Sequence, residues 1–154
     1  MIDQTKLPNE LVFVKFTDYN DVAEAIRTLV VRGAPAIGVS GAFGMALAGL
    51  QSKAETKEEL LSDLKKAQKI LFMTRPTAVN LVWGLEQIMK VAKENDSVDE
   101  IKESIIDKAK QMADEDIKIN QEMGKHGSQL FKNNDSVMTH CKDRKSTRLN
   151  SSHW

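Results

Sequence analysis

Residues 34–50 constrain the fold of this chain more than any other segment. They form its longest apolar stretch, which glycines interrupt and which is shorter than the roughly 20 residues that cross a bilayer. Each glycine inside a helix costs about 1 kcal/mol relative to alanine, so this composition makes sense where other backbones or a ligand come close. We therefore predict a buried helix, whose small residues are Gly38, Ser40, Gly41, Ala42, Gly44, Ala46, Ala48 and Gly49.

Four further segments have the apolar spacing of amphipathic helices, and a helix-capping pattern precedes each one. The candidate caps are the polar cluster at 18–21, Thr56 with Glu59, Thr74 before Arg75-Pro76, and Ser97 with Glu100. The apolar positions after these caps begin with Val22 and Ile26, with Leu60 and Leu64, with Leu81 and Leu85, and with Ile101 and Ile105. The pattern predicts that the first of these helices ends at Arg32-Gly33 and that the last, which is the longest, runs to Met123-Gly124.

Two short segments are β-prone. Residues 11–16 precede the first helix, and residues 136–141 follow the turn-like sequence at 133–135. We predict a strand at each place and expect the second strand to begin a new unit. The predicted fold class is mainly α, with a helical domain at 1–135 and the first strand of a second domain at 136–142.

The last twelve residues, 143–154, differ in character from the rest of the chain. They are polar and basic and have no apolar periodicity that would dock them onto a core. Back-translation of residues 143–153 resembles a common sequencing-library adapter, so we interpret the segment as a non-native tail. A natural disordered tail is the alternative.

The composition excludes several classes of protein. Basic and acidic residues balance at 22 each, and no basic run interleaves with aromatic residues, so nothing indicates nucleic-acid binding. The single cysteine, Cys141, cannot form an internal disulfide, and no charged segment followed by an apolar one opens the chain. We expect a cytoplasmic protein with no membrane attachment and a small-molecule partner.

Two arginines lie beside predicted helix starts, at Arg32-Gly33-Ala34 and at Arg75. Free N–H groups and the helix dipole favour an anion at such a start, and arginine is shaped for a planar, bidentate grip on a phosphate. Each local sequence taken by itself favours a structural role instead. In that alternative Arg32 complements the negative dipole end of the preceding helix, and Arg75 is a solvated neighbour of a helix cap.

Other polar side chains give weaker signals. Cys141, after His140, falls at the expected carboxyl end of a strand, where α/β sheets place ligand groups, although a lone cysteine there is more often a core residue. Asp116 and Asn120 share one helix face and are more simply a solvated pair. The sequence contains no metal-ligand cluster, phosphate loop or dinucleotide motif.

In combination these motifs resemble one family, the methylthioribose-1-phosphate isomerases, over residues 2–141. The matching segments, in order, are residues 2–8, 22–28, 31–38, 74–81 and 139–141. The family is similar to ribose-1,5-bisphosphate isomerase and to the regulatory subunits of the exchange factor for eukaryotic translation initiation factor two. The resemblance implies a helical N-terminal domain and a Rossmann-like C-terminal domain. This chain would then be an N-terminal fragment, because the family's catalytic aspartate lies further downstream.

The resemblance also implies an activity and a site. Arg32, Gly33 and Ala34 would bind the phosphate of 5-methylthioribose 1-phosphate, Arg75 would bind the substrate, and Cys141 would be the catalytic cysteine of an aldose–ketose isomerase in methionine salvage. The complete protein would be a homodimer that needs no metal or organic cofactor, and the fragment alone would be inactive. A bisphosphate isomerase and a non-catalytic translation subunit remain the alternatives. The set of Arg32, Arg75 and Cys141 favours an enzyme, and Asn80 with Trp83 favours the methylthio substrate.

Overall fold

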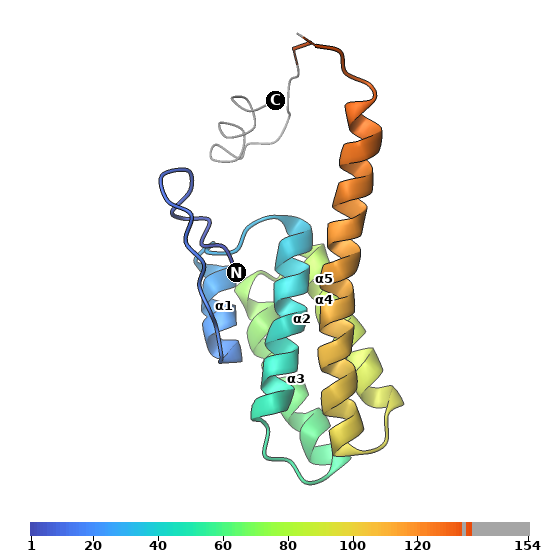
Figure 1. The fold of residues 1–154 in the computed structure, drawn as a ribbon. Helices are drawn as coiled ribbons and strands as arrows, with labels where there is room; N and C mark the ends of the chain where they lie inside the picture. Colours follow the sequence, from blue (N-terminus) through green and yellow to red (C-terminus); the bar gives the residue numbers. More distant parts are fainter. Residues whose placement is uncertain (134, 137–154) are drawn as a thin grey trace.

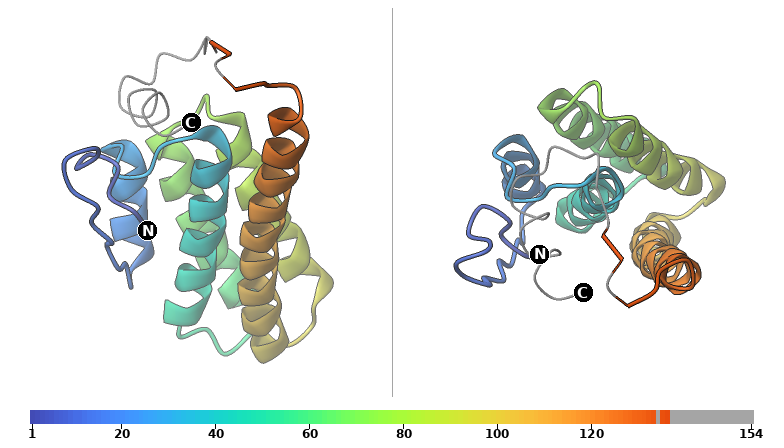
Figure 2. Two further views of the ribbon diagram at one scale, coloured as in Figure 1. Left: turned by 45° about the horizontal axis from the view of Figure 1, so that its top comes forward. Right: turned by 90° about the horizontal axis from the view of Figure 1, so that it is seen from above.

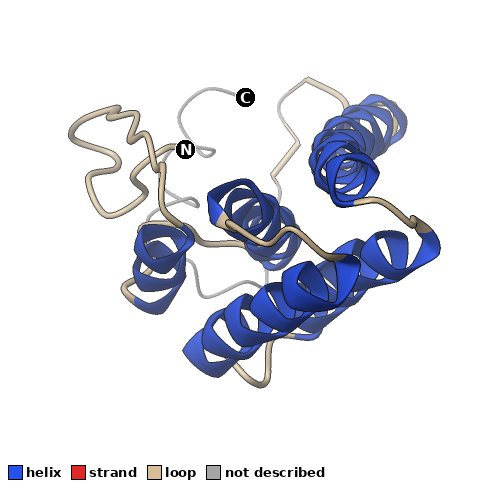
Figure 3. Ribbon diagram, turned by 90° about the horizontal axis from the view of Figure 1, so that it is seen from below, coloured by secondary structure: helices blue, strands red, loops and turns tan. Residues whose placement is uncertain are grey.

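The computed structural model describes residues 1–133 and 135–136, and this part of the chain forms five α-helices (Figure 1). In chain order they are α1 (Tyr19–Arg27), α2 (Ala34–Gln51), α3 (Lys57–Thr74), α4 (Val79–Glu94) and α5 (Val98–Ser128). Helices α2 to α5 alternate in direction, and α5 rises beyond the ends of the others. The described residues contain no strand (Figure 3), which confirms the predicted mainly α fold.

Helix α2 lies at the centre of the bundle, with α1, α3, α4 and α5 around it (Figure 2). By length and composition alone α2 is apolar enough to cross a membrane, but 56% of it is buried against the other helices. Its glycines allow this packing, because a Cβ at Gly49 would lie 2.4 Å from the Cδ1 atom of Ile105 on α5. The prediction of a buried helix approached closely by other elements is therefore confirmed.

The amphipathic helices bury the apolar positions that their spacing predicts. Burial of each large aliphatic side chain contributes about 1.5–3 kcal/mol, so these residues supply the main driving force for the fold. The fully buried ones of large volume include Ile26, Leu60, Leu64, Leu71, Leu81, Leu85, Ile88, Ile101 and Ile105.

The two predicted capping boxes are both present. Thr56 accepts a hydrogen bond from the backbone of Glu59, and Ser97 accepts one from the backbone of Glu100. In each case the glutamate side chain accepts a hydrogen bond from the backbone N–H of the cap residue. Two N–H groups at the start of α3, and two at the start of α5, therefore have side-chain partners. Helix α1 has a simpler cap, in which Asp18 accepts from the N–H of Asn20.

The predicted boundaries of three helices were wrong. Helix α1 ends at Arg27 instead of Arg32, because Leu29 adopts a positive φ of 64° and turns the chain so that Val31 is buried. Helix α5 runs past Gly124 to Ser128. Thr74 is the last residue of α3 and not the cap of α4, since the proline at 76 forces Arg75 out of the helical region, to φ −151°.

The predicted strand at 11–16 is also wrong. Residues 1–17 form an irregular segment beside α1 with a single antiparallel bridge between Ile2 and Phe13. Two short paired segments without a third rarely make a stable sheet. The second predicted strand, at 136–141, lies outside the described residues except for Ser136, as does the tail at 143–154.

Candidate functional site

Helices α2 and α4 begin at the same end of the bundle and touch through their backbones there. A Cβ added at Gly38 would lie 2.6 Å from the backbone oxygen of Asn80, and one added at Gly84 would lie 2.5 Å from the oxygen of Gly38. Only glycine permits such an approach. The second turn of α2 is thus held against the first two turns of α4, and the two helix N-termini are neighbours.

The loop before α2 carries three of the predicted site residues, Arg32, Gly33 and Ala34. Arg32 is half-buried, and its carbonyl accepts a hydrogen bond of 2.9 Å from the side-chain amide of Gln4. Gly33 is the N-cap of α2 and has φ 97° and ψ 130°, a conformation open to glycine alone. Gly33 and Ala34 are exposed, so the start of α2 faces solvent.

Arg75, the fourth predicted residue, lies in the short turn between α3 and α4. Its N–H donates to the carbonyl of Phe72, and its own carbonyl accepts from the N–H of Ala78, the N-cap of α4. Arg75 is half-buried and precedes the first residue of α4 by four positions. The structure therefore places one predicted arginine in the turn that leads into each of the two neighbouring helix starts.

These two helix starts share two properties that the other three helices lack. Neither Gly33 nor Ala78 makes a side-chain capping hydrogen bond, and neither first turn contains an acidic residue. By contrast, α1, α3 and α5 each have a side-chain cap and at least one carboxylate in the first turn. The uncapped N–H groups and the positive ends of two helix dipoles make the start of α2 and α4 the part of the described structure best suited to an anion.

Sequence reasoning missed this shared property, although its signal was present. The cap positions of α2 and α4 are Gly33 and Ala78, which have no side-chain oxygen to give. The uncapped start of α4 was missed because Thr74 looks like its N-cap in the sequence. In the structure the Thr74 hydroxyl donates to the carbonyl of Leu71 at the end of α3.

An apolar pair adjoins the α2–α4 junction. Val79 and Trp83 lie one turn apart on α4 and are 78% and 50% exposed. They lie one residue before Asn80 and Gly84, the two positions that touch Gly38.

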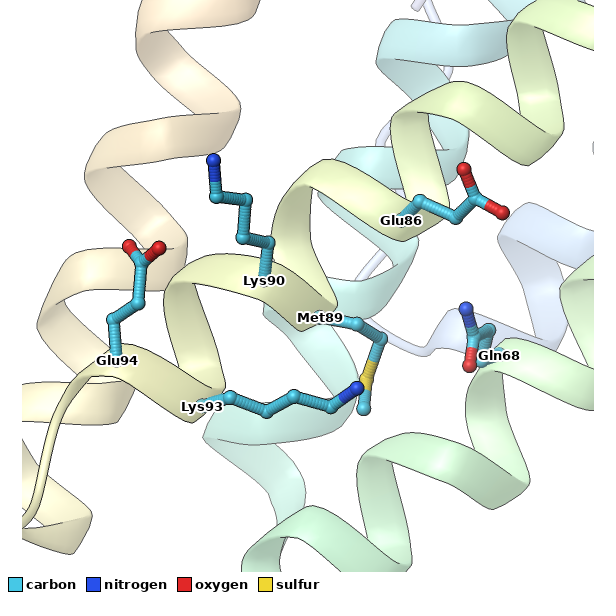
Figure 4. Close-up of a pocket in the computed structure, with 6 residues that line it drawn as sticks. All are labelled: Gln68, Glu86, Met89, Lys90, Lys93 and Glu94. Atoms are coloured by element: carbon cyan, nitrogen blue, oxygen red, sulfur yellow. The ribbon is translucent and has the colours of Figure 1, made fainter.

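Other features of the described residues do not compete with this site. A shallow hollow of about 480 Å³ between α3 and α4 is lined by Gln68, Met89 and charged side chains of both signs, but by none of the predicted site residues (Figure 4). Asn120 donates to the carbonyl of Asp116 within its own helix, which agrees with a solvated pair. No group of three metal-ligating side chains occurs among the residues that were described. Cys141 and His140 lie outside those residues, so the role of Cys141 stays a prediction.

The chain belongs to the Initiation factor 2 subunit family, whose sequence profile matches residues 30–151. Within that family it is 48% identical to a putative methylthioribose-1-phosphate isomerase of Pyrococcus horikoshii and 44% identical to a methylthioribose-1-phosphate isomerase of Geobacter metallireducens. Both alignments span 143 residues and 92% of this chain, but only 39% and 41% of the relatives. The chain therefore spans about two fifths of the length of the curated relatives it matches.

Two solved structures are similar to the fold. The 5-methylthioribose 1-phosphate isomerase of P. horikoshii superimposes with a TM-score of 0.80 at 49% identity, over 85% of this chain and 37% of that one. The translation initiation factor eIF-2B subunit delta from A. fulgidus gives a TM-score of 0.81 at 42% identity, over 88% and 40%. The resemblance predicted from the sequence motifs is confirmed.

Proposed function

We propose that this chain is the substrate-phosphate-binding part of a methylthioribose-1-phosphate isomerase, which converts 5-methylthioribose 1-phosphate into 5-methylthioribulose 1-phosphate. The observation that carries the proposal is the meeting of two uncapped helix N-termini, each preceded by an arginine, in a chain whose relatives bear that name. The phosphate would be held by Arg32, by the N–H groups at Gly33 and Ala34, and by Arg75. A phosphate held at both helix starts would fix the position of the sugar for reaction.

The chemistry of the substrate explains which further groups the complete site needs. Its anomeric oxygen carries the phosphate, so the ring cannot open by losing a free hydroxyl proton as an ordinary aldose does. An acid must protonate the ring oxygen as its bond to C1 breaks, and we assign that role to Cys141, because a thiol stays protonated when its surroundings are apolar. A base on the part of the complete protein beyond this chain would transfer the C2 proton to C1 while C2 becomes the carbonyl carbon. The C2 hydroxyl loses its proton as the carbonyl forms, and this proton replaces the one that Cys141 gave to the ring oxygen. The net reaction is an isomerisation, so it needs no redox cofactor.

The setting of the complete enzyme follows from the same proposal. The reaction belongs to methionine salvage, and we expect a cytoplasmic homodimer that acts on a sugar phosphate and binds neither nucleic acid nor membrane. We keep residues 1–135 as the helical domain, 136–142 as the first strand of a Rossmann-like domain, and 143–154 as a non-native tail.

Isomerase assays of a complete protein that contains residues 1–142 would test the proposal. We expect turnover of 5-methylthioribose 1-phosphate and a loss of about 10² or more in kcat for Cys141→Ser, which keeps the size of the side chain but replaces the thiol with a far weaker acid. An unchanged kcat in that variant would mean that Cys141 has no catalytic role and is only a core residue. The 154-residue chain alone should be inactive, because it would contain the acid without its partner base.

One alternative has a specific observation in its favour, namely the similarity to the eIF-2B delta structure. A non-catalytic translation subunit would not turn over either sugar phosphate, whereas a ribose-1,5-bisphosphate isomerase would prefer the bisphosphate. The same assay with both substrates separates all three functions.

A further inference from the structure

The turn that carries Arg32 is held by a residue far away in the sequence, Gln4. The backbone N–H of Gln4 donates to the carbonyl of Val30 at 2.9 Å, and its side-chain amide donates to the carbonyl of Arg32, also at 2.9 Å. One half-buried residue thus bonds to two carbonyls of the loop between α1 and α2. Such a paired contact fixes the orientation of the loop backbone as well as its position.

Gln4 is itself anchored by the segment around it. The N–H of Asp3 donates to the carbonyl of Val12 at 2.8 Å, and Ile2 forms an antiparallel bridge with Phe13. These contacts lie directly before Gln4 and restrict its backbone. A side chain on an anchored backbone loses less entropy when it forms a hydrogen bond than one on a free chain end, so Gln4 is well placed to hold the loop.

The bond to the Arg32 carbonyl has a geometric consequence for the next residue, Gly33. The peptide between them is trans and planar, so its C=O and its N–H point in opposite directions. A hydrogen bond that holds the Arg32 carbonyl towards Gln4 therefore directs the N–H of Gly33 away from Gln4. Gly33 has φ 97°, but glycine populates negative φ about as readily, so this peptide could rotate if nothing held its carbonyl.

We propose that Gln4 is a positioning residue for phosphate binding, which orients the Arg32–Gly33 peptide so that the N–H of Gly33 donates to the phosphate of the substrate. This inference rests on the proposed function, in which the phosphate lies at the start of α2. Gln4 acts through the backbone and touches no substrate atom. Its amide is uncharged, so it fixes a carbonyl without placing a charge of either sign beside the anion.

The test removes the amide of Gln4 in the complete protein. Gln4→Met keeps the approximate length of the side chain but cannot donate to the Arg32 carbonyl. Loss of one neutral hydrogen bond changes an equilibrium by roughly three- to tenfold, so KM for 5-methylthioribose 1-phosphate and the inhibition constant of inorganic phosphate should both rise by that factor. The value of kcat should change much less, because the groups assigned to proton transfer are unaltered.

Gln51→Met is the matched control. The side-chain amide of Gln51 also donates to a backbone carbonyl, that of Thr17 at 3.3 Å, but Gln51 is the last residue of α2 and lies at the far end of that helix. Both variants lose a bond of the same kind, and only Gln4→Met should weaken phosphate binding. A lower urea midpoint in Gln4→Met with an unchanged KM and inhibition constant would mean that Gln4 supports only the fold, and would overturn the proposal.

The amide resonance of Gly33 gives a second measurement, which does not depend on turnover. In ¹⁵N spectra of the complete protein, inorganic phosphate should shift this resonance, and Gln4→Met should raise the phosphate concentration for half the shift by the same factor. An equal midpoint in both proteins, or a Gly33 resonance that phosphate does not move, would overturn the proposal. If Gln4→Met does not fold, Gln4→Asn decides by the same titration, since its amide is one carbon too short to reach the Arg32 carbonyl. Failure of the proposed function is visible separately, because the unmutated protein would then not turn over the substrate, whatever the phosphate titration shows.

Discussion

The two ends of the helix bundle are built differently. At one end, which we call the closed end, α1, α3 and α5 begin next to the last turn of α2, and all three have side-chain caps. At the other, the open end, α2 and α4 begin, and neither has one. The closed end also contains acidic first turns, whereas the open end has an arginine before each helix.

Polar groups at the closed end are satisfied by the protein itself. Ser52, the C-cap of α2, donates to Asp63 at 2.8 Å, and its carbonyl accepts from Lys102 of α5 at 2.9 Å. Lys57 at the start of α3 pairs with Asp96 at 3.0 Å in the loop before α5. The side chain of Gln51 reaches the carbonyl of Thr17 just before α1. The closed end therefore ties four helices together without needing a ligand.

Under the proposed function, stabilising contacts and phosphate binding lie at opposite ends of the bundle. Relative to a side-chain cap, alanine at the N-cap costs a helix about 1 kcal/mol and glycine costs a few tenths, so the uncapped starts at Ala78 and Gly33 are a cost to the isolated protein. An anion bound between them would offset that cost by accepting from the same N–H groups. Sites of function are often destabilised in this way relative to the scaffold that carries them.

The largest expected effect is a loss of substrate affinity that only substitutions at the open end should cause. In the complete enzyme, Arg75→Ala should reduce substrate affinity tenfold to over a hundredfold, since losing a charged hydrogen-bond partner costs about 1.5–3 kcal/mol. Lys53→Ala removes an exposed charge just after α2 at the closed end and should leave KM unchanged. Steady-state kinetics of both variants provide the measurement, and equal KM values for Arg75→Ala and the unmutated enzyme would refute the phosphate assignment.

The next prediction concerns the helix contact that creates the open end. Gly84→Ala would place a Cβ 2.5 Å from the backbone oxygen of Gly38, which cannot rotate away, so we expect a loss of roughly 1–3 kcal/mol in unfolding free energy. Gly124→Ala on α5 is the matched control, because nothing lies within 4 Å of its added Cβ. There the better helix propensity of alanine should give a gain of up to about 1 kcal/mol. Urea unfolding of the 154-residue chain measures both, and similar changes would mean that α2 and α4 are not in backbone contact.

Much of this fold could be predicted from the sequence because its signals are local. The capping boxes at Thr56 and Ser97 and the apolar spacing of the helices after them depend only on residues close in the chain, and both were confirmed. The early end of α1 could not be predicted, since it follows from the positive φ of Leu29, which tertiary packing of Val31 imposes.

The site was only partly predictable, for a related reason. The arginines beside helix starts stand out in the sequence, but the approach of Gly38 to Gly84, 46 positions later, brings the two starts together, and no local pattern encodes it. The roles of Arg32, Gly33, Ala34, Arg75 and Cys141 remain predictions from family resemblance.

A pair of cap substitutions gives a smaller and more discriminating effect. Thr56→Ala removes a closed-end cap and should cost about 1 kcal/mol of stability without changing activity. Ala78→Asp would add a cap at the start of α4 and should raise stability by up to about 1 kcal/mol, yet it places a negative charge where the phosphate would bind. Thermal unfolding combined with KM measurements would show opposite signs for stability and affinity in Ala78→Asp. Tighter substrate binding by that variant would contradict an anion site at the open end.

The smallest expected effect is a pH dependence confined to the closed end. Hydrogen bonds from Lys66 and then Ser52 lower the pKa of Asp63 below its ordinary value of 3.8, and a hydrogen bond from the backbone N–H of Asn20 likewise lowers the pKa of Asp18. A carboxyl whose pKa is lowered by folding stabilises the protein above its unfolded pKa, and this contribution disappears as pH falls through the folded pKa. The stability difference between the unmutated chain and Asp63→Asn should therefore be present at pH 7 and shrink below about pH 4, by a small amount because the carboxyl is largely solvated. Urea midpoints at pH 7, 4 and 3 test this. A difference that stays constant over the series would mean that the bond between Asp63 and Ser52 holds the closed end together equally well when the carboxyl is protonated.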